Sequence, residues 1–238
     1  MLRAFRVRDA EARELLDEAT LDDTALTRNL ADIRRINLLL GWTNFTVRTV
    51  SHYVRANRLS SFSLLDVASG SADMPLAVAR WATGAGVAAR IIATDISPQI
   101  VSVANQQIQQ SGLANIIAER ADALAPGYAP DSFDIALCTL AIHHFMPEMA
   151  IELLRNMARV ARKVFVFDVA RSPLAYAGAV VLTRVAFMNY MTRHDAPTSV
   201  RRAYSAPELR ILAAKAGLRD ARVWVSFPFR LALEASGM

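Results

Sequence analysis

The sequence predicts a doubly wound α/β fold with a mainly parallel, seven-stranded sheet. Short apolar runs alternate with helical segments from residue 62 onward, and short connections join them. The run Phe133–Thr139 is apolar except for Asp134 and Thr139, which is typical of a parallel strand buried on both faces. Two closing runs meet at Pro228, and so tight a connection predicts an antiparallel C-terminal hairpin.

Helical segments fill the chain before the first strand. We expect a helix over Ala10–Ala19, a second that Asp22 or Asp23 caps and Gly41 ends, and a third over Thr43–Asn57. Residues 1–60 are therefore predicted to form an N-terminal helical cap. Residues 61–238 are predicted to form a single Rossmann-like domain, because the alternating pattern runs through them without a linker.

Each element of the alternating region has a local signal. The expected strands are Ser63–Ala68, Arg90–Thr94, Ile116–Ala121, Phe133–Thr139, Val164–Val169, Ala221–Phe227 and Phe229–Glu234. The expected helices are Met74–Thr83, Pro98–Ser111, Pro147–Ala161 and Ala206–Ala216. Asp73 is the expected N-cap of the first of these helices, while Gly112 and Gly217 end the second and the fourth.

Residues 172–205 are too long for an ordinary crossover loop. Within them Ala175–Met191 is almost wholly apolar and predicts one extra helix. Because Arg184 interrupts the apolar run, we expect a buried or lid helix rather than a membrane-spanning segment.

Composition excludes several classes of protein. The chain has 238 residues, of which 53% are hydrophobic and 21% charged, so it is not disordered as a whole. Cys138 is the one cysteine, which excludes an intramolecular disulfide and favours the cytoplasm. The first residues lack an apolar stretch, so we expect no secretory signal. The net charge of +5 is scattered without a basic run, so we expect no nucleic-acid partner.

Acidic and small residues follow the first three strands. Small side chains between Asp66 and Asp73 let the backbone approach a ligand at the start of the next helix. Asp95 follows the second strand, where a carboxylate can accept hydrogen bonds from both hydroxyls of a ribose, and Asp122 follows the third. Since ligands bind beyond the carboxyl ends of parallel strands, the three positions together predict a nucleoside ligand.

These segments resemble the motifs of class I S-adenosylmethionine (SAM)-dependent methyltransferases. Residues 64–72, 93–98 and 120–134 are similar to the glycine-rich first motif, the ribose-binding second motif and the adenine-side segment of that family. The resemblance implies SAM as cofactor and S-adenosylhomocysteine as product. It implies a cofactor site made of Asp66, Ala68, Ser69, Gly70, Asp73, Asp95, Ile96, Asp122, Ala123, Thr139 and Leu140. The chain departs from the family at Ala68 and Ala72, where glycine is usual, and lacks the Pro-Gly-Gly turn before strand five.

Histidines supply the candidates for catalysis. His143 lies just beyond strand four, similar in placement to the general-base histidine of small-molecule O-methyltransferases. The alternative is a histidine that packs or hydrogen-bonds within its loop. His144 is a second candidate, or lines the methionine end of the cofactor, and His194 in the insertion is a third. We expect no metal site, and Asp168 after strand five is expected to bond the neighbouring loop or Arg171.

The insertion and the N-terminal helices are expected to form a lid over an acceptor pocket. Met188, Arg193, Arg201 and Tyr204 are the expected acceptor contacts, beside the apolar wall of residues 175–191. The predicted reaction is O-methylation of a small phenolic or polyketide-like molecule, of the kind found in secondary metabolism. C-methylation of an activated ring or quinone precursor is the nearest alternative.

Two other classes of protein stay open. One is a SAM-type fold that serves only as an interaction protein. The other is a dinucleotide-binding domain, which would need a G-x-G-x-x-G motif where this chain has only Gly70. The apolar N-terminal helix pair also offers a surface for a homodimer.

Overall fold

The computed structural model describes residues 5, 7–17, 22–186 and 188–238. Seven strands form one sheet in the order β3-β2-β1-β4-β5-β7-β6. Their bounds are β1 Ser61–Val67, β2 Ala88–Asp95, β3 Ile116–Arg120, β4 Phe133–Thr139, β5 Ala161–Val169, β6 Arg222–Ser226 and β7 Arg230–Ser236. The first five strands are parallel, and β7 is antiparallel to β5 and to β6. The predicted fold class and closing hairpin are confirmed.

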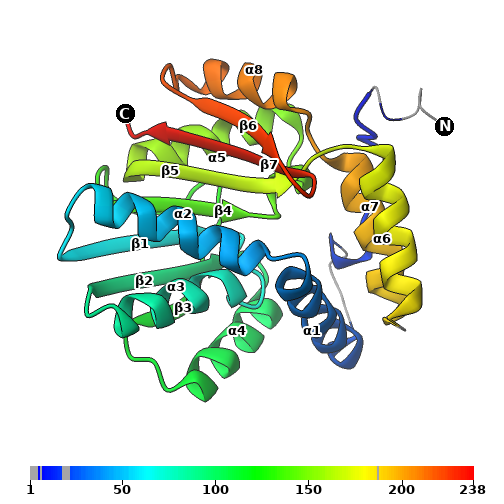
Figure 1. Ribbon diagram of the computed structural model, residues 1–238, viewed down its shortest axis with the longest axis horizontal. Helices are drawn as coiled ribbons and strands as arrows, with labels where there is room; N and C mark the ends of the chain where they lie inside the picture. The colour runs from blue at the N-terminus through cyan, green and yellow to red at the C-terminus, as the bar shows by residue number, and fades with distance from the viewer. Residues whose placement is uncertain (1–4, 6, 18–21, 187) are drawn as a thin grey trace.

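Helices cover both faces of the sheet and its carboxyl end. Their bounds are α1 Asp23–Leu39, α2 Trp42–Ala56, α3 Asp73–Gly84, α4 Pro98–Ser111, α5 Pro147–Val160, α6 Pro173–Val185, α7 Tyr190–Arg202 and α8 Ala206–Ala216, with short 3₁₀ helices η2 Leu15–Asp17 and η3 Ile142–His144. Helices α2, α3 and α4 pack on one face, and α5 and α8 on the other. Figure 1 shows α1, α6 and α7 gathered at the end of the sheet where the parallel strands finish. No described helix is long and apolar enough to cross a membrane.

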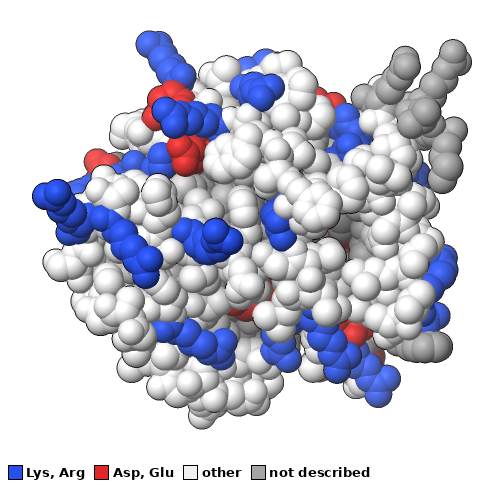
Figure 2. All heavy atoms as spheres, in the orientation of Figure 1, with Lys and Arg blue, Asp and Glu red and all other residues white. Residues whose placement is uncertain are grey.

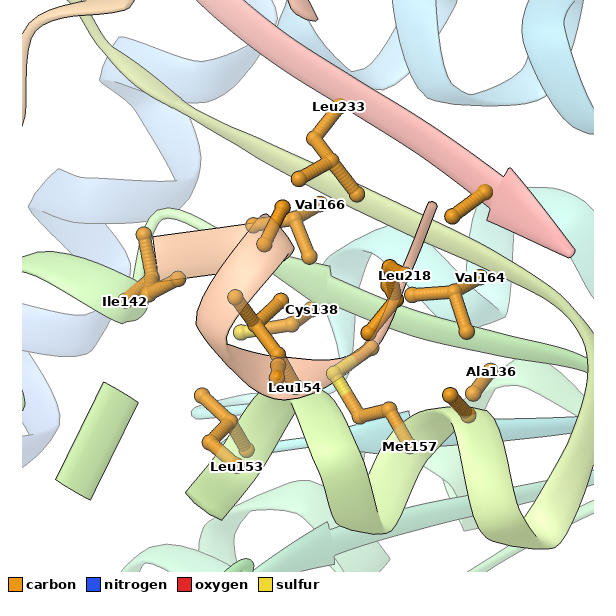
Figure 3. Close-up of a cluster of buried hydrophobic side chains, with 14 of the residues drawn as sticks. Ala136, Cys138, Ile142, Leu153, Leu154, Met157, Val164, Val166, Leu218 and Leu233 are labelled. Atoms are coloured by element: carbon orange, nitrogen blue, oxygen red, sulfur yellow. The ribbon is translucent and has the colours of Figure 1, made fainter. Parts of the chain in front are cut away.

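The core beneath α5 holds the central strands in place. Figure 3 shows Leu154 and Met157 of α5 pointing toward Cys138 of β4 and Val166 of β5. These side chains are at most 1% exposed. Burial of a leucine side chain contributes roughly 1.5–3 kcal/mol, so this layer fixes the strand ends that carry the site.

The predicted helix over Ala10–Ala19 is wrong. Residues 10–14 are not helical, Leu15–Asp17 form a single 3₁₀ turn, and residues 18–19 lie outside the described residues. The backbone N–H groups of Leu15 and Leu16 donate to the Asp195 carboxylate at 2.8 and 3.1 Å. Tertiary hydrogen bonds thus replace the helical ones that the local sequence favours.

The predicted helix over Ala175–Met191 is also wrong, because the insertion forms two helices. α6 ends at Val185 and α7 starts after Asn189, whose side chain caps it by accepting from the Thr192 N–H at 3.0 Å. The Asn189 backbone N–H donates to Asp32 of α1 at 2.9 Å. An apolar periodicity does not mark α7, since most of its buried side chains are polar.

The loop after β1 is strained where the chain departs from the family pattern. Ala68, Gly70 and Ala72 have φ values of 51°, 56° and 60°, in the left-handed region that favours glycine. Ala72 in this conformation is the N-cap of α3, so the prediction of Asp73 as N-cap is wrong.

Substitution Ala68→Gly is expected to raise the free energy of unfolding by about 0.5–1 kcal/mol. Alanine costs roughly 1–2 kcal/mol in the left-handed region, partly offset by the greater freedom of glycine in the unfolded chain. The matched control is Ala214→Gly at an exposed, right-handed position of α8, which should lower stability by about 1 kcal/mol. Urea unfolding of both variants measures the difference, and a loss in both would contradict the strain argument.

Candidate functional site

Two cavities adjoin at the carboxyl end of the sheet. The larger, about 880 Å³, is bordered by the ends of β1, β2 and β4, the loop after β1, and α1. The smaller, about 380 Å³, is bordered mainly by apolar side chains of α1, α6 and α7. Both cavities are bordered by Leu16, Ile33, Asn37, Leu140 and His144. A ligand in one would therefore lie beside a ligand in the other.

The larger cavity collects most of the predicted cofactor residues. It is bordered by Asp66, Ala68, Ser69, Gly70, Asp73, Asp95, Ile96, Thr139 and Leu140. Asp122 and Ala123 do not border it. Asp122 is exposed, and its carboxylate accepts from the Leu124 N–H at 2.9 Å within its own turn. Arg120, which the sequence analysis did not select, borders the cavity instead.

Asp95 connects the end of β2 to the loop after β1. One carboxylate oxygen accepts from the Gly70 N–H at 3.1 Å and the other from the Ser97 N–H at 3.0 Å. The N-cap of α4 is Ser97 rather than Asp95. Since a carboxylate oxygen can accept more than one hydrogen bond, both remain able to bind ligand hydroxyls.

Buried polar atoms in this cavity fit a charged nucleoside such as SAM. Asp66 Oδ1 and Thr139 Oγ1 are buried without a hydrogen-bond partner, and both residues border the cavity. Such orphan atoms are costly unless a ligand or water satisfies them. A side chain added at Gly70 would meet no protein atom within 4 Å, so the loop borders open space there. These features accommodate a ligand that carries ammonium and hydroxyl groups.

Burial raises the pKa of Asp66 to about 8, and the neighbouring carboxylates of Asp73 and Asp95 add to the effect. The folded chain therefore keeps this proton at pH values where the unfolded chain has released it. Stability must fall as pH rises from about 4 to about 8, because the unfolded state binds fewer protons over that range.

Asp66→Asn is expected to remove this pH-dependent loss of stability. The variant without cofactor should exceed the wild type in free energy of unfolding, by a margin that grows by about 2–4 kcal/mol from pH 5 to pH 8. Urea unfolding at both pH values measures the margin. Asp122→Asn, which changes an exposed carboxylate, is the control and should keep the wild-type slope. A constant margin for Asp66→Asn would show that Asp66 is ionised in the folded chain.

His143 is buried on the side of the smaller cavity and is fixed by Asp168. The Asp168 carboxylate accepts from the His143 backbone N–H at 3.0 Å and lies 2.8 Å from Nδ1. Nδ1 therefore carries the proton, and Nε2 presents its lone pair. As expected, Asp168 bonds the neighbouring loop. Nε2 lies 3.5 Å from Oε1 of Glu14.

His144 lies beside His143, with ring centroids 4.4 Å apart, and borders both cavities. Its Nδ1 is 2.7 Å from Asp17, and its Nε2 is 3.8 Å from Oε2 of Glu14. Burial disfavours the charged ring, but Glu14 and Asp17 outweigh that effect and raise the pKa of His144.

Glu14 is the site residue that the sequence analysis missed. It is 4% exposed, borders the smaller cavity and contacts both histidines. The sequence around Glu14 does not indicate a functional residue, because a glutamate in a charged, helix-forming segment usually lies on the surface. The expectation of no metal site considered only residues near strand four, whereas Glu14 comes from the N-terminal segment.

The residues predicted to contact the acceptor lie elsewhere. Met188, Arg193, Arg201, Tyr204 and His194 do not border the smaller cavity. The Tyr204 hydroxyl donates to the Phe145 carbonyl at 2.8 Å, and Arg201 pairs with Asp9. His194 is half exposed and lies 2.8 Å from Asp195, so these sequence neighbours do pair. The polar residues from α1 and the insertion that do border the cavity are Asn29, Asn37, Thr183, Thr192, Asp195 and Ser199.

Charge on the surface is dispersed. Figure 2 shows Lys and Arg side chains spread over one face of the molecule, with uncharged surface between them. Beside the histidines, Glu14 and Asp168 are buried, whereas Asp17 is exposed.

Comparisons with known proteins agree with this geometry. Residues 64–164 match a family model described as "Methyltransferase domain". No curated protein sequence matches the chain. Similar solved structures include a magnesium protoporphyrin IX methyltransferase from Synechocystis PCC 6803 with bound S-adenosylhomocysteine (18% identity, 84% of each chain covered, TM-score 0.58). A SAM-dependent methyltransferase from Aquifex aeolicus shows 16% identity over 74% of this chain and 82% of its own, with a TM-score of 0.56.

Human N-acetylserotonin methyltransferase in complex with SAM is also similar (15% identity, 91% of this chain and 56% of that chain covered, TM-score 0.63). At these identities the structural likeness shows the fold, and the matched domain supplies the activity. The domain that matches contains the loop after β1, Asp95 and the end of β4, which together border the larger cavity. The chain therefore contains a methyltransferase domain over residues 64–164, and it has the fold of SAM-dependent methyltransferases.

Proposed function

We propose that this methyltransferase methylates a hydroxyl group of a small lipophilic molecule, with His143 as the general base. The observation that carries the proposal is the position of His143. It is buried, Asp168 fixes its tautomer, and it borders an apolar cavity that adjoins the cofactor cavity. Removal of a hydroxyl proton as the methyl group transfers is the task of such a base.

SAM supplies an electrophilic methyl group on its sulfonium sulfur. Asp95 is proposed to accept hydrogen bonds from the ribose hydroxyls. Asp66 and Thr139, with their orphan buried atoms, are proposed to bind the polar end of the cofactor. Ile96, which is 59% exposed and borders the cavity, offers an apolar surface to the adenine. Residues 68–72 bring their backbone close to the ligand.

The smaller cavity is proposed to hold the acceptor. About 380 Å³ lies within the range of small-molecule sites and suits one or two rings. The inner faces of α6 and α7 close it on one side and α1 on another, so residues 1–60 act as a cap and 172–205 as a lid. A mainly apolar cavity of this size favours a phenolic or polyketide-like molecule over a nucleic acid.

Filling the cavity tests this assignment. Ala179→Phe, which places a ring where α6 borders the cavity, is expected to raise the acceptor KM about 10- to 100-fold. The Kd for SAM should stay within about twofold, because Ala179 does not border the cofactor cavity. The acceptor is the best substrate from a panel of one- and two-ring phenols.

Ala177→Phe is the matched control, since Ala177 is exposed on α6 and does not border the cavity. It should leave both constants near their wild-type values. An unchanged KM in Ala179→Phe, or equal changes in the two variants, would contradict the acceptor assignment.

A further inference from the structure

Three lone-pair donors converge beside the smaller cavity. Ligand atoms of Glu14, His143 and His144 all lie within 4.8 Å of one another. Glu14 and His143 are buried and His144 is partly buried. Nothing in the proposed methyl transfer requires both Nε2 atoms to face the same carboxylate, so the convergence calls for a separate explanation.

The Nδ1 atoms of both rings face carboxylates other than Glu14. His143 directs Nδ1 to Asp168 and His144 directs Nδ1 to Asp17, at 2.8 and 2.7 Å. Histidines that bind metals usually donate their other ring N–H to a carboxylate in this way, which fixes the tautomer and orients the ring. Two adjacent histidines with the same arrangement place both Nε2 atoms on the side of Glu14, where a cation could take them as ligands.

The spacing is close to that of ligands around one small cation. The His143 Nε2–Glu14 Oε1 distance is 3.5 Å, and the His144 Nε2–Glu14 Oε2 distance is 3.8 Å. Nitrogen and oxygen atoms bound at about 2.0–2.2 Å in tetrahedral geometry lie about 3.3–3.6 Å apart. Since the three ligand atoms lie within 4.8 Å of one another, the widest of their separations would have to shorten by at most about 1.5 Å to reach that geometry.

The local charge balance also favours a cation. Glu14, Asp17 and Asp168 are three carboxylates in contact with the two rings. The Arg202 guanidinium contacts Glu14 at 3.4 Å and Asp17 at 2.5 Å, and Arg8 donates to the His143 carbonyl at 2.7 Å. Neither arginine bonds an Nε2 atom. The Ser199 hydroxyl donates to Glu14 Oε2 at 2.9 Å and orients the carboxylate.

We propose that Glu14, His143 and His144 bind one divalent transition-metal ion of the zinc class. Two imidazole nitrogens and one carboxylate form a donor set that suits Zn²⁺ and excludes Mg²⁺ and Ca²⁺, which prefer oxygen ligands. All three residues border the smaller cavity, so the open coordination position faces the acceptor space. This inference rests on the proposed function, in which Nε2 of His143 takes the proton of the acceptor. A metal ion bound to that nitrogen would block it, so the metal-bound protein does not deprotonate the acceptor.

Metal binding is tested without any activity measurement. The metal-free chain is titrated with Zn²⁺ in competition with a chromophoric chelator, and separately with Co²⁺, whose visible absorption reports tetrahedral coordination. We expect one ion per chain. His144→Ala and Glu14→Gln should weaken binding about 10-fold or more, while His52→Ala, at an exposed position on α2, should not change it. Circular dichroism checks that each variant is folded.

Absence of stoichiometric binding, or equal affinity in wild type and Glu14→Gln, would overturn the metal site. In a second arm, Zn²⁺ should lower SAM-dependent methylation of the best phenol in proportion to occupancy, and a chelator should restore it. Undiminished methylation at full metal occupancy would show that the bound ion does not stop His143 from acting as the base, and it would overturn that part of the proposal. The proposed function fails separately, if metal binds as expected but the metal-free chain methylates no phenol.

Discussion

His143→Ala should lower kcat for the phenolic acceptor by about 10²–10⁴-fold, the usual range for loss of a general base. The Kd for SAM should stay within about twofold, because His143 borders the acceptor cavity and not the cofactor cavity. Steady-state kinetics in metal-free buffer give kcat, and calorimetry gives the Kd. A residue that only removes the proton of the acceptor should change kcat and leave the Kd for SAM unchanged.

Two further variants separate catalysis from packing. Asp168→Asn should lower kcat by about 10²-fold or more, since an amide in place of the carboxylate no longer fixes Nδ1 as the protonated nitrogen. His194→Ala should keep the wild-type kcat, because His194 lies outside the cavity and half exposed. Loss of activity in all three variants alike, or in none, would contradict the role of His143.

Asp95→Ala should weaken SAM binding about 100-fold. Its carboxylate holds the Gly70 and Ser97 N–H groups and is proposed to accept two ribose hydroxyls. Each hydrogen bond to a charged group is worth about 1.5–3 kcal/mol, so loss of two corresponds to about two orders of magnitude in affinity or more. Calorimetric titration of SAM and of S-adenosylhomocysteine measures the change.

Asp122→Ala is the informative comparison for Asp95. The sequence motif places both residues at the cofactor, but the structure uses Asp122 in its own exposed turn. Its substitution should therefore change the Kd for SAM by less than about threefold. An equal loss of affinity in the two variants would show that the adenine reaches the turn at Asp122, contrary to the geometry.

The cofactor half of the site was predictable because its signals are local. Each strand is a short apolar run, and Asp66 and Asp95 follow from their positions at the ends of two such runs. The parallel topology then brings these ends to one edge of the sheet. No long-range information beyond the alternating pattern is needed to place them together.

The acceptor half depends on contacts between distant parts of the chain. Glu14 reaches His143 across 129 residues, and it is held there by Ser199 and Arg202 of α7. That helix was missed because its buried face is polar. Arg201 and Tyr204 were selected for their polarity in the right segment, but their side chains bond Asp9 and Phe145 away from the cavity.

The central claim is that the chain transfers methyl groups to oxygen with His143 as base. The most direct measurement incubates the metal-free chain with ¹³C-methyl-labelled SAM and one- and two-ring phenols, then identifies the labelled product by heteronuclear NMR. We expect an O-methyl resonance with the wild type that is lost with His143→Ala. A C-methyl resonance, an undiminished product in the variant, or no labelled product from any phenol would contradict it.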